Sequence, residues 1–179
     1  LFLIVLFISF DLSQSECAFR FGYAYDLRFG SYISLPSNSF LGVQSSFTFN
    51  LWIKPYTTVL PKQSVIGSET DEPKRAVPRS NSGIRILQGG EVEFLVGSNF
   101  TRSPRSRISA NRWTHIAGSF DASVSGGTAW LYVNGSLAGT SSGLGYCNIV
   151  ERNFFIGRSV GINEVLSYSG LVDEISVWN

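Results

Sequence analysis

The sequence has few of the side chains that bind transition metals or act as nucleophiles. Its 179 residues include two cysteines and one histidine, His115. A structural zinc ion takes four such ligands, so these three residues cannot complete a site of that kind. His115 lies within "RWTHIAGSF" with no serine or cysteine beside it, although the members of a catalytic triad can be distant in sequence. We therefore expect neither a zinc protein nor a triad hydrolase.

No apolar run reaches the roughly 20 residues that a membrane-spanning helix needs. Residues 1–10, "LFLIVLFISF", come closest, and Asp11 ends them. They are typical of the apolar core of a secretory signal that has no basic start or initiator methionine in this sequence, and Ser13 and Ser15 suit cleavage after Ser15. We expect a signal peptide at 1–15 and one secreted domain at 16–179. The alternative is a buried strand at 1–10.

An oxidising compartment would act on the two cysteines and on two glycosylation sequons. Cys17 and Cys147 are expected to form one long-range disulfide, with two unpaired thiols as the alternative. Asn99 and Asn134 each begin an Asn-x-Ser/Thr sequon. Asn99, which we expect in a loop, is the better acceptor, because Asn134 falls in a tight turn. Unmodified asparagines are the alternative.

Helical periodicity is almost absent, whereas short β-rich runs recur between Gly, Ser, Asn and Pro. These runs alternate with the period of a strand, which places one face on a core and the other towards water. So many strands in one chain predict an all-β fold, a two-sheet antiparallel sandwich of the jelly-roll kind. The runs are residues 31–35, 46–54, 83–87, 91–97, 129–134 and 171–178.

The segment around His115 illustrates this pattern. Trp113, His115 and Ala117 alternate with Thr114 and Ile116, which predicts a strand. "TAWLYVNGSLAG" then predicts two strands joined at Asn134-Gly135, because Asn-Gly readily takes the positive φ angles that a two-residue hairpin turn needs. His115 is therefore expected in the middle of a sheet.

Four segments together resemble a known family. "SFTFNLWIKP", "RWTHIAGSFD", "WLYVNGSLAG" and "GLVDEISVWN" stand in the order and approximate spacing of laminin G-like jelly rolls, within the concanavalin A-like lectin and glucanase superfamily. The resemblance spans about residues 26–179. It implies a concanavalin A-like sandwich, and it implies an extracellular binding module only by analogy, since folds host many functions.

The superfamily's glucanases carry Glu-x-Asp-x-x-Glu on one strand, because a retaining glycosidase needs two carboxyl groups about 5 Å apart. The nearest match has Glu69 and Asp71 but Lys74 where the second Glu should stand, and Pro73 disfavours a central strand. Glu91 and Glu93 share a strand face without a third partner and are expected to point outward. We predict a chain that is not an enzyme.

Calcium-binding members of the family combine acidic side chains near the first and last strands with main-chain carbonyls. Asp173 matches the last-strand motif, and Asp26 would replace the aspartate that is missing before Gly30. The resemblance thus suggests a structural calcium ion held by Asp26 and Asp173. The alternative for Asp173 is a side chain that accepts hydrogen bonds from the backbone.

Positive charge is concentrated between residues 74 and 112, which hold eight basic residues and two acidic ones. Pro and Ser mark "SETDEPKRAVPRSNS" and "SNFTRSPRSRISANR" as loops. Neither has the interleaved aromatics that stack on bases, so we do not expect a nucleic-acid partner. Guanidinium groups suit sulfates and carboxylates, and solvated loop charge is the alternative. The predicted ligand residues are Arg102, Arg105 and Arg107, then Arg75 and Arg79.

These observations predict a secreted, non-catalytic module that recognises an extracellular glycan, including anionic polysaccharides. A rival neutral site is the pair Trp130 and Tyr132, which could stack on sugar rings or simply lie on the sheet. A module that adheres to a cell-surface or matrix protein, and an accessory carbohydrate-binding domain of a larger secreted enzyme, are the alternatives. Further domains are compatible with either.

Overall fold

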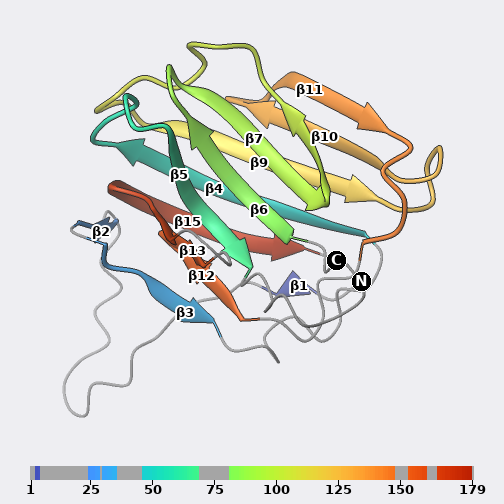
Figure 1. Cartoon of the computed structure of the whole chain (residues 1–179), viewed down its shortest axis with the longest axis horizontal. Coiled ribbons are helices and arrows are strands. Elements are labelled where there is room, and N and C mark those ends of the chain that lie inside the picture. The colour runs from blue at the N-terminus through green and yellow to red at the C-terminus, as the bar shows by residue number, and fades with distance from the viewer. Residues whose placement is uncertain are drawn as a thin grey trace.

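A computed structural model of the chain describes residues 3–4, 24–28, 30–35, 46–68, 81–147, 153–160 and 165–178. Strands dominate these residues (Figure 1). They are β1 (Leu3–Ile4), β2 (Tyr25–Leu27), β3 (Ile33–Leu35), β4 (Ser46–Pro55), β5 (Lys62–Ser68), β6 (Asn81–Leu87), β7 (Glu91–Gly97), β8 (Asn99–Arg102), β9 (Thr114–Asp121), β10 (Thr128–Val133), β11 (Ser136–Ser142), β12 (Phe154–Ile156), β13 (Arg158–Val160), β14 (Val165–Ser167) and β15 (Gly170–Trp178).

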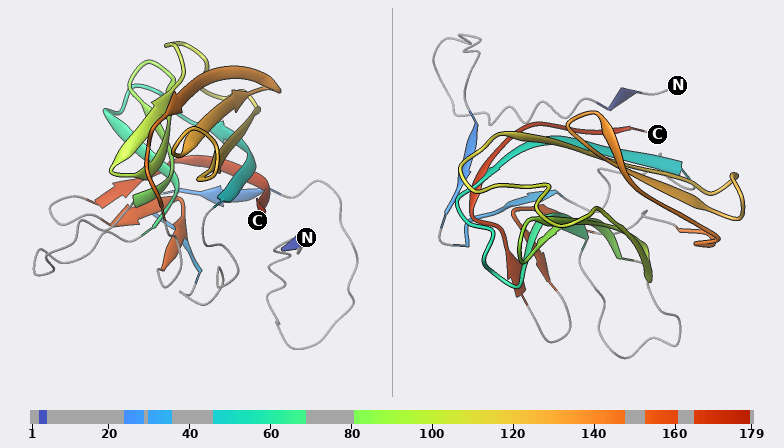
Figure 2. Two further views of the ribbon diagram at one scale, coloured as in Figure 1. Left: turned by 90° about the vertical axis from the view of Figure 1, so that its right-hand side faces the viewer. Right: turned by 90° about the horizontal axis from the view of Figure 1, so that it is seen from above.

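In the described part of the chain, the strands form two large antiparallel sheets that lie face to face (Figure 2). The seven-stranded sheet has the order β1-β15-β4-β9-β10-β11, with β2 also paired to β15. The six-stranded sheet has the order β3-β12-β5-β6-β7-β8, and β13 pairs with β14. This arrangement confirms the predicted all-β two-sheet sandwich. Within these residues, no helix has the length and apolar character needed to cross a membrane.

The alternation seen in the sequence becomes the two faces of the seven-stranded sheet. In β4, Phe47, Phe49, Leu51 and Ile53 are buried, while Trp52 between them is exposed. β9 buries Ile116 and turns its intervening residues outward. The predicted β10–β11 hairpin is confirmed, with φ of 51° at Asn134 and 75° at Gly135. One face of this sheet therefore packs on the core and the other is open.

Aromatic rings fill the space between the sheets. The ring of Phe94, on β7, lies 6.1 Å from Phe47 and 6.3 Å from Phe49, both on β4, in edge-to-face arrangements. Phe47 also contacts Phe120, and Phe49 contacts Phe154 from β12. Edge-to-face pairs add about 0.5–1.5 kcal/mol each beyond the burial of their surface. The phenylalanine cluster thus joins strands that are distant in sequence.

Tyr168 should make the stability of the protein sensitive to alkaline pH. It is fully buried and donates a hydrogen bond from its hydroxyl to the Leu171 carbonyl, 3.0 Å away. Burial raises the pKa of the Tyr168 hydroxyl well above its ordinary value. The folded state therefore keeps a proton that the unfolded chain loses above about pH 10, and the free energy of unfolding should fall by about 1.4 kcal/mol per pH unit there. Urea titrations from pH 9 to 11 should show a shallower slope for Tyr168→Phe than for the wild type, and equal slopes would contradict this.

The structure corrects one predicted loop, and it does not test the predicted cleavage site of the signal peptide. The stretch 98–112 was expected to be a loop, but its residues Asn99–Arg102 form β8, because they pair with β7 across a short turn. Near the start of the chain, Leu3 pairs with Trp178 and Ile4 with Val177 at the edge of the seven-stranded sheet. The other residues of the predicted signal segment lie outside the described residues, so cleavage after Ser15 stays a prediction.

Candidate functional site

All four tryptophans of the chain have partly or well exposed rings, although tryptophan is usually among the more buried residues. Three of them lie on the open face of the seven-stranded sheet, and Trp113 precedes the first residue of β9. Trp52 is 36% exposed, Trp113 41% and Trp178 41%. We call this surface the tryptophan face. Its residues are Thr48, Asn50, Trp52, His115, Ala117, Ser119, Trp130, Tyr132, Ser176 and Trp178.

Strand register arranges these residues in rows across the sheet. One row runs Trp178, Thr48, Ser119, Trp130, on β15, β4, β9 and β10. Trp178 and Trp130 are thus separated by two intervening strands, or about 14 Å at the usual strand spacing of about 4.8 Å. Small side chains occupy the two intervening positions. The tryptophan face is therefore a floor of small residues between two aromatic rims.

A chain of hydrogen bonds joins side chains of neighbouring strands on the tryptophan face. His115 Nε2 donates to Asn50 Oδ1 over 2.6 Å, and Asn50 Nδ2 donates to Ser176 Oγ over 3.2 Å. Trp178 Nε1 also donates to Ser176 Oγ, 3.0 Å away, and the Trp52 ring lies 5.2 Å from the His115 ring. These contacts fix the side chains on the face. Among the described residues, no carboxylate or hydroxyl nucleophile contacts the His115 ring, which agrees with its predicted place in a strand.

Two residues of the tryptophan face, Trp130 and Tyr132, were predicted from the sequence as a possible sugar-stacking pair. Trp130 and Tyr132 do share one surface of β10, and both are partly exposed. Their neighbours Trp52, His115 and Trp178 were not predicted as ligand residues, because the order of strands in the sheet cannot be deduced from strand patterns. The available signal was that Thr48, Asn50 and Trp52 alternate with the apolar residues of one strand.

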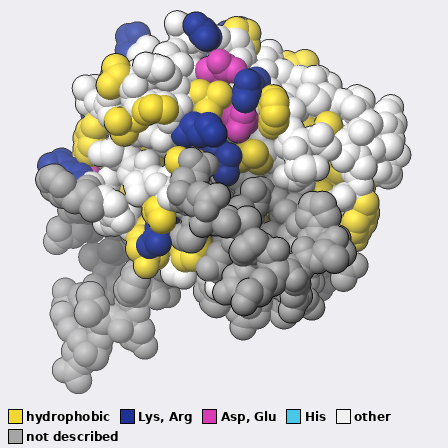
Figure 3. Space-filling view, viewed as in Figure 1, with side chains coloured by type: hydrophobic (Ala, Val, Ile, Leu, Met, Phe, Trp, Pro, Cys, Tyr) yellow, Lys and Arg dark blue, Asp and Glu magenta, His cyan; other side chains and the backbone are white. Residues whose placement is uncertain are grey.

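Two of the five arginines of the predicted site, Arg102 and Arg105, form ion pairs within the protein. Arg102 Nη2 lies 2.7 Å from Glu93 Oε2, and its guanidinium stacks 4.2 Å from the centre of the Phe100 ring. Arg85 lies 3.9 Å from Glu93, and Arg105 lies 4.0 Å from Glu91. Figure 3 shows basic and acidic side chains lying next to one another on this side of the molecule. Glu93 points outward as expected, since it alternates with the core residues Val92 and Phe94, but it is only 4% exposed because the arginines cover it.

The other predicted arginines are placed differently. Arg75 and Arg79 lie outside the described residues, as do Glu69 and Lys74. Arg107 is exposed in the loop between β8 and β9, and its backbone N–H donates to the Gly90 carbonyl over 3.0 Å. Arg107 therefore does not share the ion-paired surroundings of Arg102 and Arg105.

The two residues suggested for calcium, Asp26 and Asp173, have hydrogen-bond partners within the protein. Arg28 Nε lies 2.7 Å from Asp26 Oδ2, and the Tyr56 hydroxyl donates to Asp26 Oδ1 over 2.8 Å. Although desolvation opposes them, these hydrogen bonds lower the pKa of Asp26. Asp173 accepts the backbone N–H of Glu174. No group of three or more His, Cys, Asp or Glu side chains could hold a metal ion within the described residues. A structural calcium ion stays a prediction from the resemblance alone.

The predicted modifications can be located only in part. Cys147 is a buried free thiol in this structure, with Sγ 3.3 Å from Ser82 Oγ, and Cys17 lies outside the described residues, so their disulfide stays a prediction. Asn99 begins β8 rather than lying in a loop, and its Nδ2 donates to the Leu144 carbonyl. Asn134 lies in the β10–β11 turn, as predicted. Glycosylation at either asparagine stays a prediction.

Solved structures with the same architecture include sialidase domains and a domain of an arabinanase. The Ruminococcus gnavus IT-sialidase CBM40 bound to α2,3-sialyllactose aligns with a TM-score of 0.69 at 14% identity, covering 88% of this chain and 89% of that one. Domain 4 of AbnA, a GH43 extracellular arabinanase from Geobacillus stearothermophilus, in complex with arabinotriose, gives 0.62 at 20% identity, covering 89% and 72%. The NanB sialidase from Streptococcus pneumoniae gives 0.67 at 17% identity, covering 88% of this chain and 26% of that one. At these identities the likeness shows the fold.

Sequence comparison points to the same fold family. The pentraxin-related protein PTX3 of Homo sapiens is 28% identical over 145 residues, which cover 75% of this chain and 35% of that protein. The chain thus spans about a third of PTX3 and about a quarter of NanB. A laminin G-type family profile, described as the concanavalin A-like lectin/glucanases superfamily, matches residues 28–179. The chain belongs to this laminin G-like family of the concanavalin A-like lectin/glucanase superfamily.

Proposed function

We propose that the chain is a non-catalytic glycan-binding module that acts outside the cell and holds sugar rings on the tryptophan face. The exposure of all four tryptophans carries this proposal. Exposed aromatic clusters on a soluble fold usually mark binding sites, because leaving such rings in water is unfavourable. Aromatic rings can stack on the apolar faces of sugars. The polar floor supplies partners for sugar hydroxyls.

The floor has hydrogen-bonding capacity left over. Asn50 has used one of its two amide hydrogens on Ser176, and the Nδ1 atom of the His115 ring forms no hydrogen bond within the described residues. Tyr132 adds a hydroxyl on the opposite rim. Several related structures are named as carbohydrate-binding modules or sugar complexes, which supports a glycan as the ligand class. The secretory character of residues 1–10 supports an extracellular setting.

Removing one aromatic rim should weaken glycan binding at least about tenfold, the equivalent of about 1.4 kcal/mol. The wild type would be screened on an array carrying arabinotriose, sialyllactose and β-glucan oligosaccharides, and the strongest hit measured by calorimetry. Trp130→Ala should lose affinity, and so should Trp52→Ala. Tyr146→Ala is the matched control, because Tyr146 is 66% exposed in the loop after β11 and is not one of the residues of the tryptophan face. This variant should bind the glycan normally.

The same measurements can contradict the proposal. Equal losses for Trp130→Ala and Tyr146→Ala would show that the face is not the site. No array binding, combined with capture of a matrix protein that Trp130→Ala abolishes, would favour the adhesion alternative. Release of new reducing ends from the bound oligosaccharide would overturn the non-catalytic assignment. Stacking should also survive a change from about 50 to 500 mM salt, since salt screens charges rather than apolar contacts.

A further inference from the structure

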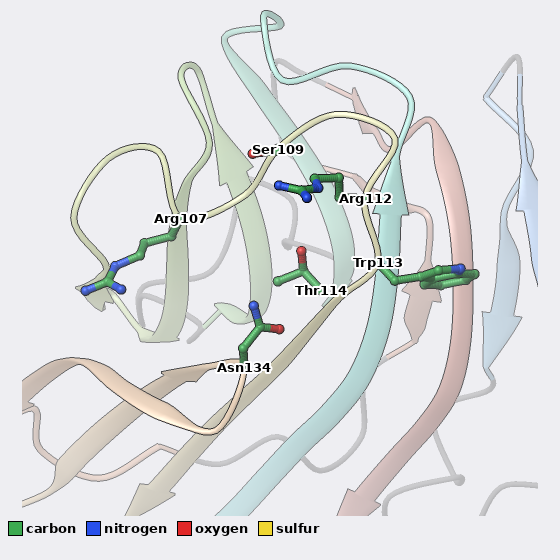
Figure 4. Close-up of a pocket in the computed structure, with 6 residues that line it drawn as sticks. All are labelled: Arg107, Ser109, Arg112, Trp113, Thr114 and Asn134. Atoms are coloured by element: carbon green, nitrogen blue, oxygen red, sulfur yellow. The ribbon is translucent and has the colours of Figure 1, made fainter.

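A second candidate site lies at one end of the sandwich, where the β8–β9 loop faces the β10–β11 turn. A hollow of about 280 Å³ opens between them. It is lined by Arg107, Ser109, Arg112, Trp113, Thr114 and Asn134 (Figure 4). Neither the sequence patterns nor the family resemblance pointed to these residues as a group, with Arg107 alone predicted as a ligand residue.

Backbone hydrogen bonds hold both walls of the hollow in place. In the loop, Ile108 is buried and its N–H donates to the Gly90 carbonyl over 3.0 Å, while the Asn111 N–H donates to the Pro55 carbonyl over 2.7 Å. In the turn, the Asn134 N–H donates to the His115 carbonyl over 2.9 Å. A ligand would therefore meet side chains that are already positioned, which reduces the entropy lost on binding.

The side chains around the hollow are rich in hydrogen-bond donors, with two guanidinium groups, an amide and two hydroxyl groups. Asn134 Oδ1 already accepts the backbone N–H of His115 over 2.9 Å, so the Asn134 amide group presents its N–H donors. Figure 4 shows this nitrogen on the side of Thr114, whose hydroxyl points towards Arg112. Thr114 is 3% exposed, and its hydroxyl has no hydrogen-bond partner in the described part of the chain. No acidic residue lines the hollow.

The charge of the hollow is also uncompensated. Arg102 and Arg105 have glutamate partners, but no ion pair joins Arg107 or Arg112 to an acid within the described residues. The Arg112 guanidinium extends over the hollow, whereas Arg107 extends outward from its rim (Figure 4). A guanidinium with neutral donors beside it is suited to an oxyanion, because charge-assisted hydrogen bonds are about twice as strong as neutral ones.

We propose that this hollow binds a carboxylate or sulfate substituent of a glycan whose sugar rings lie on the tryptophan face. The inference rests on the proposed function, since Trp113 connects the two surfaces. Trp113 lines the hollow with its neighbours, and its indole extends away from them across β4 towards β15 (Figure 4). Arg112, Thr114 and Asn134 would hold the anionic group, and the rings of Trp113 and Trp52 would hold the adjoining sugars.

The test compares an acidic oligosaccharide with its neutral form. Oligogalacturonate and its fully methyl-esterified form have the same sugar chain, and each carboxylate of the acid is a neutral methyl ester in the other. Calorimetry should show the wild type binding the acid at least about tenfold more tightly than the ester, and Arg112→Gln should remove this preference. Arg105→Gln is the matched control, because it removes the same charge from a side chain that is 84% exposed in the same loop. All variants would carry Ser136→Ala, which abolishes the Asn134 sequon and keeps Asn134 free of a glycan.

The outcomes distinguish failure of the hollow as an anion site from failure of the tryptophan face as a sugar site. Trp130→Ala should weaken the acid and the ester equally, which tests the tryptophan face alone. Equal loss of preference in Arg112→Gln and Arg105→Gln would show that net charge attracts the acid and would overturn the hollow as a site. Absence of any preference in the wild type would overturn it as well, while leaving ester binding as support for the face. Titration with inorganic sulfate should shift the side-chain NMR signals of Arg112 and Asn134 if sulfate esters are also accepted.

Discussion

Changing Glu93 to Gln should lower the free energy of unfolding by about 2–3 kcal/mol and should at the same time strengthen retention on a heparin column. Glu93 is nearly buried and lies 2.7 Å from Arg102 and 3.9 Å from Arg85. Removing one partner of a fully buried ion pair typically costs about 3–5 kcal/mol, because it leaves an uncompensated charge. The expected loss is smaller here, because the Arg102 side chain is 44% exposed and can turn towards water.

Urea unfolding measures the first effect and elution salt the second. Glu91→Gln is the control for stability, since Glu91 contacts its arginines only at 3.7 and 4.0 Å and should cost less than about 1 kcal/mol. Stronger heparin retention is expected because the Glu93 change releases Arg102 and Arg85. Weaker or unchanged retention of Glu93→Gln would show that the arginines on this face do not meet anions even when unpaired.

The contrast between β4 and β5 explains how much of the fold was predictable. β4 has one face on the core and one face open, so its apolar residues alternate and its bounds were predicted to within one residue. β5 lies in the middle of the six-stranded sheet and is buried at every position after Lys62, including Gln63 and Ser64. A strand buried on both faces has no alternation, and its polar residues hide it further. It was therefore missed.

The candidate sites were harder to predict, because they depend on which strands are neighbours. Glu93 and Arg102 are nine residues apart, yet they pair directly across β7 and β8, and this turns a basic segment into an ion-paired surface. The stretch containing Arg102 was expected to be a loop, so nothing placed the two side chains together. Likewise, Trp130 and Trp178 belong to one surface only because β9 and β4 lie between β10 and β15. Charge counts and motif spacing carry no such information.

The largest loss of stability is expected where the two sheets meet at Phe94. Phe94→Ala should lower the free energy of unfolding by about 3–5 kcal/mol, because the ring is fully buried against Phe47 and Phe49 and its removal leaves a cavity. Urea unfolding would measure this. Leu137→Ala is the control, since Leu137 is 56% exposed and should change stability by no more than about 0.5 kcal/mol. A loss for Phe94→Ala as small as that of the control would mean that this ring is not packed in the core.

Gly118 makes this packing possible, and a double-mutant cycle should show it. A Cβ added at Gly118, on β9, would lie 2.7 Å from Cδ2 of the Phe94 ring. Alanine normally stabilises a strand interior relative to glycine by about 0.5–1 kcal/mol. Here Gly118→Ala should instead cost about 1–3 kcal/mol, because the ring has no room to move away. In the Phe94→Ala background the clash disappears, so Gly118→Ala should become neutral or stabilising, and the two changes should couple by more than about 1 kcal/mol. If the two changes in the free energy of unfolding were additive, the packing of the Phe94 ring would not require a glycine at position 118.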